Sequence, residues 1–307
     1  MRDRKRCNVM TVLCIGNATY DTTIPMEGFP LENSKNRVKA RVECGGGPAS
    51  NAAYLLGKWG IETYFAGAVG NDAHGKKILE EFTSVDVNCE YLELNSDFPT
   101  PTGFIIANVL TGTRTVLTYR PGELHLNNSN IGLKPDIILV DGQEYKVSKK
   151  CMEDNPDAIS IIDAGRVTKE VVDLAKMADY LVCSKKFAEE FTGITIDFNN
   201  MDTIIALYKK MTETFTNEII ITLEEKGCLF RKNNTIKLIA SLKTKPVDTT
   251  GAGDIFHGAF TYCIAKGYDV EKSLKIANIT GALSVTKIGG RNSVPALDEV
   301  LDIYEKQ

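Results

Sequence analysis

The sequence predicts an α/β protein with a doubly wound, mainly parallel sheet that carries helices on both faces. Short runs of continuously apolar residues, typical of buried parallel strands, alternate along the chain with segments whose apolar residues recur at helical spacing. The chain has 307 residues, 43% of them hydrophobic, which is enough for a large core. This alternation is the layer pattern of a sheet covered on both sides.

The apolar runs predict six strands, and the helical patterns between and after them predict seven helices. The strands are expected at 11–15, 62–66, 136–140, 158–162, 180–183 and 218–222. The helices are expected at 49–59, 73–82, 169–176, 186–191, 203–215, 255–266 and 270–286.

Two segments interrupt this rhythm. Residues 22–44 and about 98–120 alternate apolar and polar residues without an intervening helix, and the second segment reads as a hairpin around Thr111-Gly112-Thr113. We expect them to form a small β-sheet lid on one domain that spans residues 1–307. Another hairpin is expected at 228–239, with its turn at Lys232-Asn233-Asn234.

The overall composition argues against a nucleic-acid-binding, secreted or membrane-spanning protein. A formal net charge of −4 gives no electrostatic footprint for nucleic acid. The eight scattered cysteines form no Cys-x-x-Cys pair and favour free thiols in a reducing compartment. No apolar run is long enough to span a membrane, and the basic N-terminus leads into an expected strand at 9–15, not into a signal peptide. We therefore expect a cytoplasmic protein without nucleic-acid or membrane partners.

The most informative segment is Asp248-Thr-Thr-Gly-Ala-Gly-Asp254, which joins a small-residue turn to the start of a helix. The first N–H groups of a helix have no intrahelical partner, and the helix start attracts anions. The N–H groups around Gly251, Ala252 and Gly253 therefore predict an anion hole, and Asp254 a general base toward a hydroxyl. The alternative is an ordinary turn with an acidic residue in the first helical turn.

Two other glycine motifs do not fit this segment. A dinucleotide fingerprint needs its third glycine earlier than Gly258, and no Gly-Lys-Ser/Thr follows as in a P-loop. Lys185 and Lys186 are expected to be solvated lysines at a helix start, and His257 a packing or capping histidine.

A second glycine-rich turn, Gly45-Gly46-Gly47-Pro48, also leads into an expected helix. Its backbone can approach a polyhydroxyl ligand, and Asn51 can both donate to and accept from vicinal hydroxyls. Asp21 follows the first strand, at the end of a parallel sheet where ligands bind. The alternatives are a plain strand-to-helix turn with Pro48 in the first helical turn, and an exposed loop acid.

Together these residues resemble the ribokinase-like (PfkB) carbohydrate kinases. Residues 248–254 look like the second signature of that family, and Gly46-Gly47-x-x-x-Asn51 looks like the first. Gly16-x-x-x-x-Asp21 fits the sugar-binding position near the N-terminus, and residues 222–227 lie where the family has a nucleotide loop. The match covers essentially the whole chain, in order.

The resemblance implies a nine-stranded α/β domain with a lid, and an ATP- and magnesium-dependent kinase that phosphorylates a primary hydroxyl of a monosaccharide. It also implies a homodimer formed through the lid, as in many members. It assigns roles to four groups of residues: Asp254 as the base with Gly251, Ala252 and Gly253 as the anion hole; Asp21, Gly46, Gly47 and Asn51 at the sugar; Thr222, Gly227 and Asn278 at the nucleotide; and Asp248, Thr250 and Gly290 at a monovalent cation such as K⁺.

The chain departs from the family pattern in two places. Ser184-Lys185-Lys186-Phe187 stands where many members carry Asn-x-x-Glu, and Glu224 replaces a glycine of the nucleotide loop. We expect the Glu224 side chain to point away from the phosphates, because an acid there is unfavourable. The sugar is open among ribose, fructose and related ketoses. The alternatives are a nucleoside kinase of the same fold and a catalytically silent sugar-binding regulator.

Overall fold

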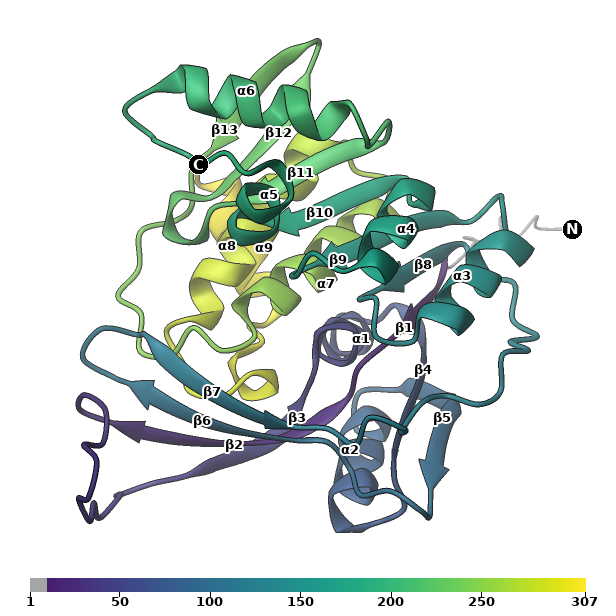
Figure 1. Ribbon diagram of the computed structural model, residues 1–307, viewed down its shortest axis with the longest axis vertical. Coiled ribbons are helices and arrows are strands. Elements are labelled where there is room, and N and C mark those ends of the chain that lie inside the picture. The colour runs from purple at the N-terminus through teal and green to yellow at the C-terminus, as the bar shows by residue number, and fades with distance from the viewer. Residues whose placement is uncertain (1–9) are drawn as a thin grey trace, which may run out of the picture.

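The computed structural model describes residues 10–307, and its central feature is a nine-stranded sheet (Figure 1). The strand order is β13-β12-β11-β10-β9-β8-β1-β4-β5. The strands are β1 (Thr11–Ile15), β4 (Glu62–Gly70), β5 (Val87–Asn95), β8 (Ile137–Val140), β9 (Ile159–Ala164), β10 (Tyr180–Ser184), β11 (Glu218–Thr222), β12 (Cys228–Lys232) and β13 (Thr235–Ile239). From β11 to β5 all neighbours are parallel, and β12 and β13 add an antiparallel hairpin at one edge.

Helices cover both faces of this sheet. They are α1 (Pro48–Lys58), α2 (Ala73–Thr83), α3 (Tyr145–Asp154), α4 (Lys169–Met177), α5 (Lys185–Thr192), α6 (Met201–Thr212), α7 (Ala252–Ala265), α8 (Val270–Ser284) and α9 (Leu297–Glu305). Strand side chains alternate between two cores: Val12 and Cys14 pack with α1, α2, α7, α8 and α9, whereas Leu13 and Ile15 pack with α3 to α6. Both sides of each central strand are therefore apolar, which explains the continuous apolar runs.

The strand order changes direction at β1, which lies between β4 and β8. The chain first extends the sheet through β4 and β5, then returns to the other side of β1 and continues through β8 to β13. The crevice beyond the carboxyl ends of β1 and β8 is therefore the topological switch point, where open α/β sheets bind ligands.

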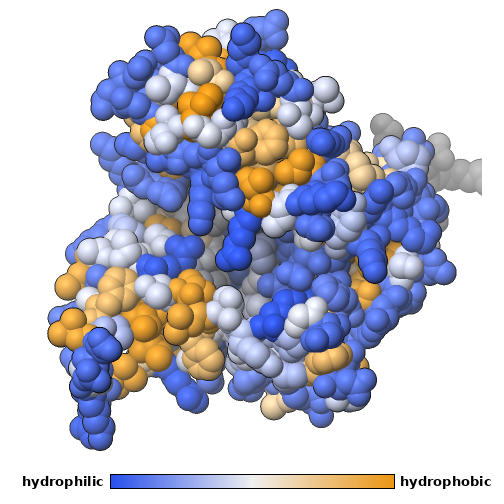
Figure 2. All heavy atoms as spheres, in the orientation of Figure 1, coloured by the Kyte–Doolittle hydropathy of each residue, from blue (hydrophilic) through white to orange (hydrophobic). Residues whose placement is uncertain are grey.

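A separate four-stranded sheet, which we call the lid, lies over this end of the molecule (Figure 1). Its strands, in the order β3-β2-β6-β7, are β2 (Thr19–Met26), β3 (Val42–Gly46), β6 (Thr102–Asn108) and β7 (Arg114–Tyr119). Figure 2 shows apolar side chains gathered over the lid and a hollow between the lid and the larger body.

The hairpin tip of the lid contacts the segment that precedes α7. Arg114 Nη1 donates to Thr249 Oγ1 at 2.6 Å, and Thr249 Oγ1 donates to the carbonyl oxygen of Gly112 at 3.0 Å. Gly112 also lies so close to Pro246 that a Cβ atom there would be 2.5 Å from the proline Cβ. The lid therefore contacts the loop that carries the second glycine signature.

All six predicted strands and all seven predicted helices are present; β1 and β11 have the predicted ends, and the other elements have shifted ends. The lid sheet is confirmed and extends further than predicted, because β2 begins at Thr19 and β3 ends at Gly46. The hairpin after β11 is also confirmed, and its turn residues Asn233 and Asn234 have φ values of 49° and 60°. The prediction missed β5, α3 and α9. The basic N-terminus and Val9 lie outside the described residues.

Across residues 10–307, no helix is both long enough and apolar enough to cross a bilayer. The seven cysteines in this range are free thiols, and six of them are buried.

Candidate active site

The second glycine signature forms the start of α7. Gly251 precedes the helix with a φ of 74°, a left-handed conformation that favours glycine. The N–H groups of Gly253 and Asp254 have no partner among the described residues, and that of Ala252 makes only a long bond of 3.4 Å to the Thr249 carbonyl. The predicted anion hole is therefore a helix start with free N–H donors, and Asp254 lies in its first turn.

Asn51, in the first turn of α1, connects the two signatures. Its Nδ2 donates to Asp254 Oδ2 at 2.7 Å, although the residues are 203 positions apart. Its Oδ1 is buried and has no hydrogen-bond partner in the described structure. The two helices come close together because Gly258 of α7 lies against Ala52 of α1, where an added Cβ would be 3.1 Å from the alanine Cα. A buried acceptor without a partner indicates a missing donor, such as a ligand hydroxyl.

Asp21 projects from β2 of the lid toward the same crevice. Its Oδ1 accepts from Thr19 Oγ1 at 2.8 Å, and its carboxylate fills the space left by the absent side chains of Gly46 and Gly103. The pKa of Asp21 is raised to about 6, mainly by burial and also by the negative charge of Asp254, although the Thr19 hydrogen bond and the Arg291 charge lower it. Asp21 and Asp254 thus belong to one electrostatic site.

The turn before α1 is held by an acid that the sequence reasoning missed. Gly47, with a φ of 97°, lies against the Asn17 carbonyl, so a side chain at this position would clash. At the end of β8, Asp141 Oδ2 accepts from the N–H groups of Asn17 at 2.8 Å and Ala49 at 3.2 Å, and Oδ1 from Gln143 at 2.9 Å. Its position directly after a buried strand was the available signal.

Two basic residues connect the lid to the body, and the sequence reasoning assigned neither of them a role. Arg120, directly after β7, donates to Asn17 Oδ1 at 2.6 Å and pairs with the buried Glu144 at 3.0 Å. The buried Arg291 pairs with Glu81 at 2.7 Å and donates to the Ser50 hydroxyl. Both arginines lie near ends of lid strands, and their hydrogen bonds and ion pairs hold the lid in place beside the crevice.

The predicted cation residues lie on two adjacent loops. Asp248 Oδ1 accepts from the Thr250 N–H at 2.9 Å and from its hydroxyl at 2.6 Å, while Oδ2 accepts from the Gly289 N–H at 2.9 Å. The Gly290 carbonyl accepts from the Ser293 hydroxyl at 2.7 Å. The Asp248 carboxylate therefore holds the two loops together through hydrogen bonds.

The predicted nucleotide residues lie beyond the end of β11. Thr222 ends that strand, and Gly227 closes the loop with a φ of 102°. Glu224, where the family has a glycine, has a φ of 55°, which is a left-handed conformation. Asn278 of α8 donates to the Ile239 carbonyl at 3.2 Å, so its amide is held against β13.

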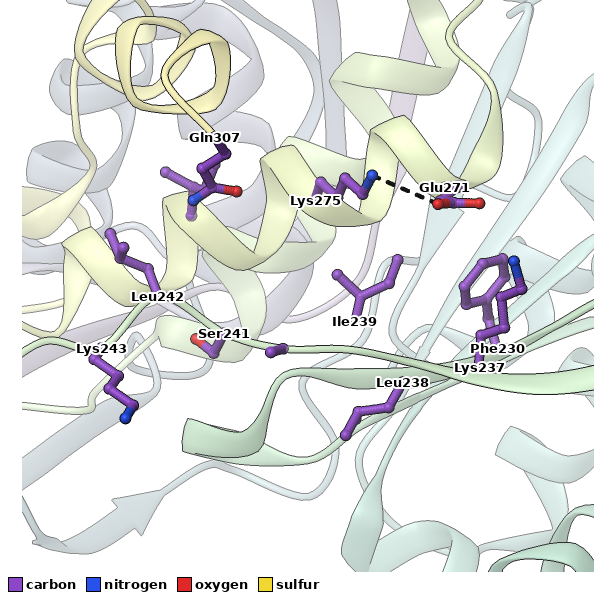
Figure 3. A pocket seen from close by; sticks show the side chains of 12 residues that line it. Phe230, Lys237, Leu238, Ile239, Ser241, Leu242, Lys243, Glu271, Lys275 and Gln307 are labelled. Atoms are coloured by element: carbon purple, nitrogen blue, oxygen red, sulfur yellow. Dashed lines mark ion pairs between the residues drawn. The ribbon is translucent and has the colours of Figure 1, made fainter.

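A cavity of about 590 Å³ is lined by Ile239, whose carbonyl oxygen accepts from Asn278, and by Ile279, the next residue of α8 (Figure 3). Ile239 and the chain that follows β13 form one wall, and Ile279 and Lys275 of α8 form another. Lys275 pairs with Glu271 at 3.5 Å on the rim. The cavity has apolar walls and charged groups at its edge.

The departure at residues 184–187 forms the start of α5. Ser184 Oγ accepts from the Phe187 N–H at 3.0 Å, so it caps the helix. Lys185 Nζ lies 3.7 Å from Oε1 of Glu189, one turn later in the helix, and Lys186 is exposed. Neither a metal nor a phosphate role is indicated for these side chains.

His257 is buried in α7, one turn after the anion hole, as a packing histidine would be. It also faces Asp163 at the end of β9, which the sequence reasoning did not assign to the site; Nδ1 lies 3.3 Å from Asp163 Oδ2. Burial raises the pKa of Asp163, the His257 charge lowers it, and the charges of Asp254 and Asp141 raise it.

The chain is similar to known proteins over nearly its whole length. The sequence model of a family described as pfkB family carbohydrate kinase matches residues 10–297. A ribokinase from Bacillus subtilis (strain 168) is 25% identical over 305 residues, covering 95% of this chain and 98% of that protein. A nucleoside kinase from Methanocaldococcus jannaschii is 24% identical, covering 96% and 97%.

Solved structures show the same fold. A ribokinase from Thermotoga maritima has a TM-score of 0.78 and 23% identity, covering 97% of this chain and 100% of that one. The structure of Arabidopsis thaliana ribokinase complexed with ribose and ATP has a TM-score of 0.78 and 22% identity, covering 97% and 99%.

Proposed function

We propose that this chain, which belongs to the pfkB family of carbohydrate kinases, transfers the γ-phosphoryl group of ATP to a primary hydroxyl of a monosaccharide. The observation that carries this proposal is the Asn51–Asp254 contact at 2.7 Å, beside a buried Asn51 Oδ1 without a partner. It joins a free hydrogen-bond acceptor, a carboxylate and a helix start at one place. A sugar hydroxyl supplies the missing donor and then lies beside Asp254.

Asp254 acts as the general base in this proposal. Its carboxylate takes the proton of the primary hydroxyl while the hydroxyl oxygen forms a bond to the γ-phosphorus. The bond between that phosphorus and the β,γ-bridging oxygen breaks, and ADP leaves with the electron pair. The free N–H groups of Gly253 and Asp254 stabilise the charge on the equatorial oxygens.

The sugar is held mainly from the lid side in this proposal. The Asp21 carboxylate and the Asn51 amide bind vicinal hydroxyls, and the Gly46-Gly47 turn keeps Asp21 in place. Thr222, Gly227 and Asn278 line the path toward the nucleotide. The cavity beside Asn278 offers apolar walls for the adenine base.

Magnesium is implied by family membership. The described residues contain no group of three or more His, Cys, Asp or Glu side chains that could hold a metal. This fits an ion that arrives on the nucleotide phosphates and keeps several of its waters. Bound there, magnesium neutralises developing phosphate charge. A potassium site at Asp248, Thr250 and Gly290 is a further proposal, in which backbone oxygens of the two loops serve as ligands.

The names of its relatives leave the acceptor open between sugars and nucleosides. Relatives of comparable similarity are named ribokinase, deoxyribokinase and nucleoside kinase. A panel of ribose, deoxyribose, fructose, other ketoses and nucleosides, each assayed for ADP production from ATP, identifies the class. A silent regulator requires that sugar binding raises the melting temperature without any turnover.

The buried free thiols support a reducing, cytoplasmic setting.

The first prediction concerns Asp254. The Asp254→Asn substitution removes the base but keeps an acceptor for Asn51, so kcat should fall by about 10²- to 10⁴-fold. Affinity for ATP should stay within about twofold, since the affected step is proton transfer and not nucleotide binding. Steady-state kinetics and calorimetric titration with ATP measure the two quantities. Turnover close to the wild-type value in this variant would overturn the assigned role.

A further inference from the structure

Both ring nitrogens of His257 face oxygen atoms that can only accept hydrogen bonds. Nδ1 lies 2.6 Å from the carbonyl oxygen of Gly253, and Nε2 lies 3.2 Å from that of Val182. A neutral imidazole carries one N–H and can satisfy only one of these carbonyls. The doubly protonated ring donates to both, and it therefore fits this environment better.

Asp163 supplies the opposite charge. Its Oδ2 lies 3.3 Å from Nδ1 of His257, and its side chain is only 12% exposed. A positive ring and a negative carboxylate at this depth compensate each other, whereas either alone would be costly to bury. Asp254 and Asp141 bring further negative charge near Asp163 and raise its pKa, whereas a positive His257 lowers it.

The Gly253 carbonyl belongs to the same peptide group as the Asp254 N–H. That N–H is one of the free donors at the start of α7. A hydrogen bond from a charged donor to the carbonyl polarises the peptide and strengthens its N–H as a donor. The charge of His257 is thus passed through one peptide group to the anion hole.

We propose that His257, paired with Asp163, is a positioning residue for phosphoryl transfer that strengthens the Asp254 N–H donor through the Gly253–Asp254 peptide group. This inference rests on the proposed function of α7 as the anion hole. It assigns a role to a buried histidine and an acid that neither glycine signature contains. Its effect should be largest where the transferred phosphoryl group carries most charge.

The test compares binding of ADP alone with binding of ADP plus aluminium fluoride, a mimic of the phosphoryl group in transfer, with magnesium present. His257→Leu removes both donors, so affinity for the mimic should fall by at least about tenfold. Affinity for ADP alone should change by less than about twofold, because ADP lacks the phosphoryl group that the anion hole would bind during transfer. Asp163→Asn should also lower the affinity for the mimic. His257→Asn keeps a neutral donor, so its affinity for the mimic should lie between those of the wild type and His257→Leu.

Thr261→Val is the matched control, because Thr261 is buried on the same helix and donates to the His257 carbonyl at 2.8 Å. It should lower the melting temperature without changing the preference for the mimic. Equal losses for ADP and the mimic in the His257 variants, or no loss, would overturn the inference. If His257→Leu does not fold, the affinities of His257→Asn and Asp163→Asn for ADP and for the mimic provide the test. Since the readout needs no sugar, a failed acceptor screen remains a separate result.

Discussion

The carboxylates of the crevice differ in what surrounds them, and this decides what each one can do. Asp141 is partly buried and holds backbone N–H groups of two separate segments, so its oxygens are occupied. Asp254 accepts from Asn51 and stands at a helix start. Asp21 belongs to the lid itself, and only its Oδ1 accepts a side-chain hydrogen bond, from Thr19, so Oδ2 can accept from a ligand hydroxyl.

The raised pKa of Asp21 gives a pH-dependent prediction for stability. The pKa is about 6 in the folded protein, whereas an aspartate in an unfolded chain has a value of about 3.9. Between these values the unfolded chain loses its proton first, so this carboxyl lowers stability as the pH rises from about 4 to about 6. Above about pH 6 the destabilisation by the ionised Asp21 carboxylate has its full value.

Asp21→Asn removes this cost and keeps the acceptor for the Thr19 hydroxyl. At pH 7.5 the variant should be more stable than the wild type by about 1–3 kcal/mol, and the difference should vanish near pH 4. Urea unfolding at both pH values measures it, with the exposed Asp157→Asn as the control. A variant less stable than the wild type at pH 7.5 would contradict this account. Sugar binding should weaken in the same variant.

Which of these residues can be found from sequence depends on whether they lie in a local pattern. Asn51 and Asp254 follow glycine turns, and these turns identify them in the sequence as candidate site residues. Asp141 directly follows β8, and Asp163 lies near the end of β9. That position is a signal, but alone it does not separate a site acid from a solvated acid. Their role comes from strand order, which places the ends of β8 and β9 beside α1 and α7.

Among the elements, the central strands were predicted, whereas the edge strand β5 and the helices α3 and α9 were missed. The central strands are apolar on both faces. By contrast, the apolar–polar alternation of β5 (Val87–Asn95) shifts by one residue between Tyr91 and Leu92. The start of α3 has no side-chain cap, and its buried face includes Ser148 beside apolar residues. Tertiary packing, not local sequence, decides such elements.

The nucleotide loop carries a prediction at this scale. Glu224 holds a left-handed φ of 55°, which costs a non-glycine residue about 1 kcal/mol. Glu224→Gly should therefore stabilise the fold by up to about 1 kcal/mol and, by removing a negative charge from the proposed nucleotide loop, lower KM for ATP. Chemical unfolding and steady-state kinetics measure the two effects.

Two control variants separate these effects. Glu224→Gln keeps the strained backbone and removes only the charge, so it should lower KM for ATP without a gain in stability. Glu225→Gly affects an exposed neighbour whose φ is not positive, and should destabilise by about 0.5–1 kcal/mol. A loss of stability in Glu224→Gly itself would show that the loop conformation differs from the one described.

For the molecule as a whole, the lid has two faces with different uses. The face with Asp21 and Ile105 covers the crevice, and Ile105 is buried. The opposite face leaves Phe104, Leu117 and Tyr119 more than half exposed, and Figure 2 shows apolar side chains gathered over the lid. Exposed apolar surface of this kind marks a contact site, which supports the proposed homodimer.

Leu117→Glu should abolish that dimer, because it places a charge in the centre of the apolar face. The expected result is a monomer by sedimentation equilibrium, with the wild type sedimenting as a dimer. Leu238→Glu is the matched control, since Leu238 is 53% exposed on β13 and far from the lid in the fold, and it should leave the mass unchanged. A monomeric wild-type protein would contradict the proposal.

The close approach of Gly258 to Ala52 has a consequence for how the site tolerates sequence change. The spacing between Asn51 and Asp254 is set where two helix backbones meet at a glycine, with very little side-chain volume between them. Substitutions elsewhere in the core can alter packing without altering that spacing. A distance fixed by main chains can therefore persist while most of the surrounding side chains diverge.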